Sequence, residues 1–197
     1  MTALAMLIAL VVVLQVVSAL ISRFGGGLSI TLTLVPVVVG AILFGKRGGA
    51  VLGFAFGAIV LINCIITLDL GGAILWAANP FLTAILCLLK GIAAGFIPAV
   101  LYRLICGKAK KISGTRKYVG ALVAALSAPV VNTSIFICGM LIFFRDTLYA
   151  WAGSTSVVIY IFTVLVGINF LIEFLTNIIL TPAIVRIVDV VGKRYNK

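Results

Sequence analysis

Histidine is absent from this chain of 197 residues, and only four residues are acidic. Without histidine the chain can form neither a Ser-His nor a Cys-His nucleophile pair, and it has no imidazole to offer a metal ion. Glu173 lies in the middle of an apolar segment, whereas the other acidic residues lie in predicted loops or at predicted span ends: Asp69, Asp146 and Asp189. A single buried carboxylate cannot supply the paired groups of general acid and base catalysis, so we expect no enzyme.

Two further sequence signals of catalysis or metal binding are missing. There is no GxxxxGK[ST] phosphate-binding loop, so any ATP-driven step would need a separate ATPase subunit. The cysteines form no CxxC pair and lie within or at the ends of apolar segments: Cys64, Cys87, Cys106 and Cys138. We therefore expect inert buried thiols, with no metal, no disulfide framework and no cofactor.

Charge is scarce in this chain, and apolar residues are abundant. Charged residues make up 10% of the sequence and hydrophobic residues 64%, with a mean hydropathy of +1.37. A soluble domain needs more polar surface than this, so the composition predicts a protein of the lipid bilayer. The net charge of +11 is placed at the ends of apolar segments, where topology and anionic headgroups account for it. We expect no binding of nucleic acid.

Long apolar segments follow one another along the chain. A hydrocarbon core of about 30 Å takes ~20 helical residues, whereas the strands of a membrane barrel alternate over about ten. The sequence therefore predicts an all-α integral membrane protein, a single domain over residues 1–197 with six transmembrane helices. The predicted spans are residues 3–21, 28–44, 48–66, 80–106, 118–144 and 157–188.

Lysine and arginine lie mainly on alternate connections between these spans. Short loops rich in these residues stay in the cytoplasm, so both the N and C termini are predicted to be cytoplasmic. The first, third and fifth connections, predicted to be outside, carry Arg23, Asp69, and Arg145 with Asp146. The basic residues of the second, fourth and C-terminal segments are Lys46, Arg47, Lys108, Lys110, Lys111, Arg116, Lys117, Arg186, Lys193, Arg194 and Lys197.

Glycines at four-residue spacing mark one face of two predicted helices. Gly49, Gly53 and Gly57 share a face of the third span, and Gly91 and Gly95 share a face of the fourth. Small residues in this pattern let the backbones of membrane helices approach closely. We expect these faces to lie in helix contacts.

Two opposite charges are predicted to lie at the same membrane depth. Lys90 precedes Arg103 by 13 residues, and Glu173 precedes Arg186 by 13 residues. Both helices run inward, so each charge lies about 20 Å from a cytoplasmic anchor. Charges at membrane depth face a cavity or each other, so the pair either binds a ligand or fixes helix packing.

Polar residues from several spans accompany this pair. They are either interhelical hydrogen-bonding groups or the lining of a small-molecule site open to the outside, and the second interpretation accounts better for their number. The predicted substrate-binding residues are Asn79, Lys90, Asn132, Thr133, Arg145, Asn169 and Glu173, with Asn63 and Asn177 close to them.

Nearly the whole chain resembles a family of vitamin-binding membrane proteins. The AMLIA of residues 5–9 and the stretch LVPVVVGAILFGKRGGAVLG of residues 34–53 are similar to the substrate-binding S component of an energy-coupling-factor (ECF) transporter. The resemblance implies that Ala5 and Ala9 dock on a transmembrane coupling subunit joined to two ATPase subunits. It also implies capture of a vitamin from outside the cell, and toppling in the bacterial plasma membrane to release it. Intramolecular packing is the alternative role for the two alanines.

The side chains available for binding indicate which chemical groups the vitamin has. Lys90, Arg23 and Arg145 suit a carboxylate, asparagines suit amides and hydroxyls, and aliphatic side chains suit branched alkyl groups. Pantothenate has all three, and the APVVNT of residues 128–133 is also similar to pantothenate-type S components. Riboflavin, another vitamin or a biosynthetic precursor stays open.

Three other classes of protein remain as alternatives. A proton-coupled carrier would use Glu173 as its proton site, although the chain has no evident inverted repeat. A structural membrane subunit of the rod-shape type would need no ligand, and its polar residues would only hold helices together. An intramembrane enzyme is the third alternative.

Overall fold

The structure is a computed structural model that describes residues 2–24, 33–107 and 113–195. The described residues are helical and include no strand, which confirms the predicted all-α class. In chain order the elements are α1 (Thr2–Phe24), α2 (Leu34–Ile65), α3 (Leu70–Ala78), α4 (Pro80–Cys106), α5 (Gly114–Phe143), α6 (Arg145–Ala152), α7 (Val157–Tyr160), the π-helical segment η1 (Ile161–Val166) and α8 (Gly167–Tyr195).

Within the described residues, five helices are long and apolar enough to cross a membrane. They are α1, α2, α4, α5 and α8, whereas the sequence predicts six spans: the predicted spans 28–44 and 48–66 both fall on α2, and the first of these begins outside the described residues. The predicted fourth span, residues 80–106, has the same limits as α4. Asn79 caps the start of this helix and Pro80 occupies its first turn, where a missing N–H costs nothing, so both signals favour this boundary.

The helix α2 is folded back on itself at Gly45. This residue has φ +69° and ψ −159°, a conformation that essentially only glycine adopts. A Cβ on Gly40 would meet the side chain of Leu52, although twelve helical residues would separate them by about 18 Å in a straight helix. The helix therefore consists of a first arm, residues 34–44, and a second arm, residues 46–65, which lie side by side.

The second arm of α2 packs on α4 with backbone against backbone. A Cβ on Gly53 would collide with the carbonyl oxygen of Gly91, and a Cβ on Gly49 would collide with that of Gly95. The predicted glycine faces thus contact each other, and this prediction is confirmed. We call this contact the glycine seam. The contact continues at Gly57 of the second arm, where an added Cβ would collide with the backbone carbonyl oxygen of Cys87 of α4.

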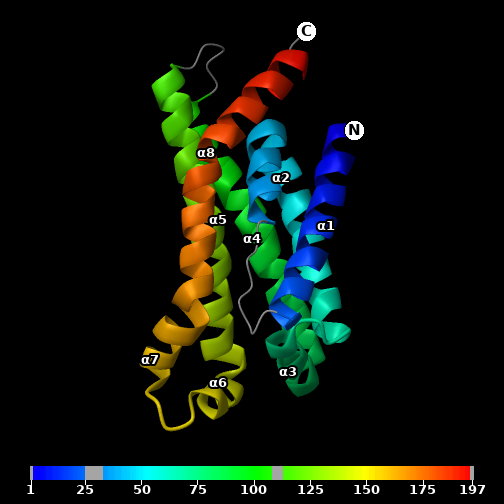
Figure 1. Cartoon of the computed structure of the whole chain (residues 1–197), viewed down its shortest axis with the longest axis vertical. Coiled ribbons are helices and arrows are strands. Elements are labelled where there is room, and N and C mark those ends of the chain that lie inside the picture. The colour runs from blue at the N-terminus through cyan, green and yellow to red at the C-terminus, as the bar shows by residue number, and fades with distance from the viewer. Residues whose placement is uncertain (1, 25–32, 108–112, 196–197) are drawn as a thin grey trace.

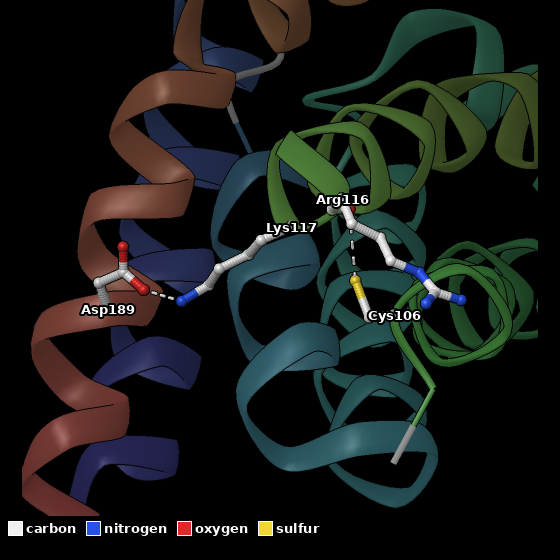
Figure 2. Close-up of polar contacts among 4 residues, drawn as sticks. All are labelled: Cys106, Arg116, Lys117 and Asp189. Carbon is white, nitrogen blue, oxygen red and sulfur yellow. Dashed lines mark hydrogen bonds and ion pairs between the residues drawn. The ribbon is translucent and has the colours of Figure 1, made fainter. Parts of the chain in front are cut away.

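The two ends of the molecule differ in character. Figure 1 shows both termini at one end, which we call the terminal end, and α3, α6 and α7 at the opposite end, the far end. At the terminal end Lys117 of α5 forms an ion pair with Asp189 of α8 (Figure 2). The adjacent Arg116 donates from Nε to the carbonyl of Ile105 at 2.6 Å, so α4, α5 and α8 are joined there.

The far end contains two short helices where the sequence predicts only loops. The predicted third connection, residues 67–79, contains α3, because the Asp69 carboxylate accepts a hydrogen bond from the Gly72 N–H at 3.0 Å and caps the helix. The other short helix, α6, begins at Arg145, immediately after α5 ends. A nine-residue helix such as α3 gives little periodic signal, so its cap is the sequence feature that predicts it.

Candidate ligand-binding cavity

A cavity of about 180 Å³ lies among α1, the second arm of α2, α4, α5 and α8. The turn between α2 and α3 also lines it, which places it toward the far end of the molecule. Its walls contain more polar than apolar residues, in a chain that is mostly apolar. The lining residues are Gln15, Ser18, Ala19, Phe56, Val60, Asn63, Leu68, Asp69, Lys90, Asn132 and Glu173.

The two charges predicted at membrane depth face this cavity together. Lys90 comes from α4 and Glu173 from α8, and both side chains are partly buried. In the part of the chain that the structure describes, neither is in an ion pair. The Lys90 ammonium lies 5.0 Å from the ring centroid of Phe136 on α5, which holds it by a cation–π contact. The ammonium therefore keeps its hydrogen-bond donors available to a ligand.

Asn132 of α5 completes this side of the cavity, as the sequence predicts for a polar residue near mid-span. Its Oδ1 is buried and has no hydrogen-bond partner among the described residues. The preceding Pro129 is buried in the same helix. The neighbouring Thr133 is half-buried and does not line the cavity.

One wall of the cavity is the turn that follows the C-terminal end of α2, and this turn contains a residue with a positive φ angle. The carbonyl oxygen of Asn63 accepts hydrogen bonds from the N–H groups of Leu68 at 2.9 Å and Asp69 at 3.1 Å. This pattern needs a left-handed residue after the helix, and Thr67 fills that position with φ +58°. A β-branched residue is strained there, by about 1 to 3 kcal/mol. The two hydrogen bonds to the Asn63 carbonyl fix the turn, and both Leu68 and Asp69 line the cavity.

Asp69 has two roles in this wall. Its carboxylate caps α3 by accepting the Gly72 N–H, and the same side chain lines the cavity. With Glu173 and Lys90, the cavity contains two carboxylates and one ammonium group among the residues described. Such a site can bind a ligand that has both polar and charged groups.

Other residues predicted for the site lie elsewhere. Asn79 caps α4, because its Oδ1 accepts the Leu82 N–H at 3.1 Å, and it does not line the cavity. Arg145 is exposed on α6, where its Nη2 donates to the Tyr149 hydroxyl at 3.3 Å. Asn177 is buried on α8 and donates from Nδ2 to the Glu173 carbonyl at 2.8 Å. The side chains of Asn169 and Arg23 lie outside the described residues.

Sequence reasoning missed three polar residues of the cavity: Gln15, Ser18 and Asp69. Gln15 and Ser18 are three residues apart on α1 and therefore share a face. They interrupt the run VVVLQVVS, so polar residues at helical spacing inside an apolar segment are the signal that identifies them. Asp69 was assigned to a loop, and its place in the cavity follows from the turn at Thr67.

The predicted docking residues lie on another side of α1. Ala5 and Ala9 are both exposed, whereas Val11 and Gln15 are buried. One face of α1 thus meets the rest of the molecule and the cavity, and the face with the two alanines points away from it. An exposed stripe of small residues is suited to close contact with another helix.

Comparison with known proteins gives two matches. The family model described as Thiamine transporter protein (Thia_YuaJ) matches residues 1–191. The pantothenic acid transporter PanT of Lactococcus lactis subsp. cremoris (strain MG1363) is 30% identical over 183 residues, which cover 92% of this chain and 89% of the relative. No solved structure matches the chain. Both matches are to transporters of a vitamin, as the resemblance found in the sequence implies.

Proposed function

The chain belongs to the thiamine transporter protein family, and we propose that it is the S component of an ECF importer with pantothenate as its ligand. Membership of this family and several apolar helices make it a multi-pass protein of the bacterial plasma membrane and a transport protein. The finer points, which are the topology, the vitamin and the partner subunits, rest on the arguments below.

The chain crosses the membrane six times in this proposal. The two arms of α2 each count as one crossing, although the first arm is short, and α1, α4, α5 and α8 supply the others. Lys46 and Arg47 lie at the fold between the arms, and Arg116 and Lys117 lie in the first turn of α5, which begins at the terminal end (Figure 1). By the distribution of basic residues the terminal end is cytoplasmic. The cavity toward the far end then receives its ligand from outside.

The observation that carries the choice of pantothenate is an ammonium group that forms no ion pair within the described residues and that lines the cavity together with three amides. Lys90 can donate charge-assisted hydrogen bonds to a carboxylate, while Gln15, Asn63 and Asn132 can bind amide and hydroxyl groups. Val60 and Ala19 add apolar surface for an alkyl group. The relative that is named for pantothenic acid supports the same choice.

Thiamine is the second candidate. The name of the family favours it, and the carboxylates of Asp69 and Glu173 suit its cationic ring. Phe56 is the one aromatic residue among the described lining of the cavity, however, and a heteroaromatic cation is held best between several aromatic faces. The lining therefore favours pantothenate.

The partner subunits follow from the resemblance and from the exposed face of α1. Ala5 and Ala9 would contact a transmembrane coupling subunit, which is joined to two ATPases. The absence of a phosphate-binding loop in the sequence supports a separate source of energy. In this proposal the isolated chain binds its vitamin in liposomes but does not accumulate it.

Calorimetric titration of the purified chain with pantothenate and with thiamine tests the ligand. We expect pantothenate to bind, and Lys90→Met to weaken its binding by at least about tenfold through loss of charge-assisted hydrogen bonds. Lys46→Met is the matched control, because its ammonium also lies over a ring, that of Phe96 at 5.8 Å, but outside the cavity. Binding of thiamine in place of pantothenate, weakened by Glu173→Gln, would favour the second candidate.

A further inference from the structure

Three amide side chains from three helices have buried polar atoms at the cavity that find no partner within the described part of the chain. They are Oε1 of Gln15 on α1, Nδ2 of Asn63 on α2 and Oδ1 of Asn132 on α5, and none has a hydrogen-bond partner among the described residues. All three residues line the cavity. Gln15 is 8% exposed and Asn63 is 2% exposed, so bulk solvent does not satisfy them. We call these residues the amide set.

Unpaired buried polar atoms are costly, and folded proteins contain few of them. Each such atom loses its water without gaining a protein partner, at a cost of about 1 to 3 kcal/mol. Three such atoms at one cavity, each from a different helix, therefore favour the binding of a ligand that supplies hydrogen-bonding groups there. A ligand that supplies those groups recovers the cost when it binds.

The types of the three atoms define what the ligand must offer. The oxygens of Gln15 and Asn132 accept hydrogen bonds and require two donors, whereas the nitrogen of Asn63 donates and requires an acceptor. An amide N–H and a hydroxyl are suitable donors, and a carbonyl oxygen is a suitable acceptor. Lys90, on the same cavity, adds a position for an anionic group.

We propose that the amide set binds the hydroxy-amide part of an anionic ligand whose carboxylate is held by Lys90, which makes Gln15 and Asn63 specificity-determining residues of the site. This inference rests on the proposed function and deepens it, because it assigns ligand contacts to α1 and α2. Two other buried atoms provide a contrast. Thr33 Oγ1 and Asn177 Oδ1 also lack partners among the described residues, but neither residue lines the cavity.

Substitutions of similar volume separate recognition of the ligand from stability of the fold. Gln15→Met, Asn63→Leu and Asn132→Leu remove the amides, and Thr33→Val is the matched control outside the cavity. We expect each of the first three to weaken pantothenate binding by about tenfold or more, the effect of one buried hydrogen bond. Their thermal unfolding without ligand should be unchanged or higher, because an unpaired polar atom is removed. Thr33→Val should leave affinity unchanged.

Analogues of pantothenate test the same hydrogen bonds by changing the ligand instead of the protein. Pantothenate with a methylated amide nitrogen lacks one donor, and it should bind about tenfold more weakly to the unmodified chain. In the variant that has lost the corresponding acceptor, Gln15→Met or Asn132→Leu, this difference should disappear. A difference that persists undiminished in both variants would overturn the proposal.

The failure of this inference is distinct from failure of the proposed function. If the unmodified chain binds no pantothenate at all, the proposed ligand is rejected, and with it the assignment of its hydroxy-amide part. If the unmodified chain binds pantothenate and Asn63→Leu and Gln15→Met bind it equally well, the amide set is rejected as a binding group while the function stands.

Discussion

Lys90 of α4 and Glu173 of α8 face one cavity, and neither forms an ion pair within the described residues. A packing pair would bring the two charges into contact, because a charge at membrane depth is stable only when it is compensated. Here the Lys90 ammonium lies over the Phe136 ring instead. Within the described residues the two charges therefore do not make the contact that a packing pair requires.

Removal of both charges should abolish binding without unfolding the protein. A single substitution strands the other charge in surroundings of low dielectric, so the double variant Lys90→Met with Glu173→Gln is the better test. We expect a single thermal transition in detergent and a loss of vitamin affinity of more than about a hundredfold, or ~2.7 kcal/mol. Normal binding by the folded double variant would show that the two residues serve packing alone.

Relief of strain at Thr67 should stabilise the protein. Asparagine tolerates left-handed φ values and keeps a polar side chain, so Thr67→Asn should raise the free energy of unfolding by about 1 kcal/mol. Binding should be unaffected, because the turn is retained. The measurement is thermal unfolding in detergent with and without ligand. Ser134→Asn, at an exposed position within α5, is the control and should not stabilise the protein.

A single methyl group in the glycine seam should be strongly destabilising. A Cβ on Gly53 would collide with a backbone carbonyl of α4, which cannot move as a side chain can, so Gly53→Ala should cost at least about 1 to 3 kcal/mol. Gly114→Ala is the matched control, because nothing lies within 4 Å of the added Cβ there. The melting temperature of Gly53→Ala should be lower than that of the unmodified chain, whereas that of Gly114→Ala should be unchanged or higher. Equal stability of both would contradict the packing described.

Enlarging the exposed stripe of α1 should prevent transport but not binding. Ala5→Leu and Ala9→Leu place bulk where close helix contact is expected, and neither residue lines the cavity. Vitamin uptake by cells should fall severalfold, while the affinity of the purified chain is retained. Ala150→Leu, an exposed position on α6, should change neither. Equal loss of uptake and binding in a folded variant would contradict a docking role.

The helical core was predictable because simple geometry defines it. Apolar length sets the limits of α4, glycine spacing sets the seam, and the fixed rise of a helix brings Lys90 and Glu173 to a common level. These predictions depend on the geometry of single helices, and the only contact between helices that they require is the glycine seam.

The rest of the site depends on tertiary arrangement. Gln15 becomes a cavity residue only because α1 packs beside the second arm of α2, and Asp69 only because the turn at Thr67 brings it inward. Arg145 was selected for its charge, but its place on α6 beside Tyr149 depends on where α5 ends. The local sequence pattern does not show the packing of α1, the turn at Thr67 or the point where α5 ends.

The glycine seam also determines which helices are free to open the cavity. Contact between two backbones has no side-chain rotamers that could rearrange, so the second arm of α2 and α4 behave as one rigid plate. Asn63 and Lys90 are fixed to this plate, while Gln15, Asn132 and Glu173 belong to helices outside it. In the proposed function a ligand therefore enters and leaves by movement of α1, α5 or α8 against this plate, and three of these five binding groups move with those helices.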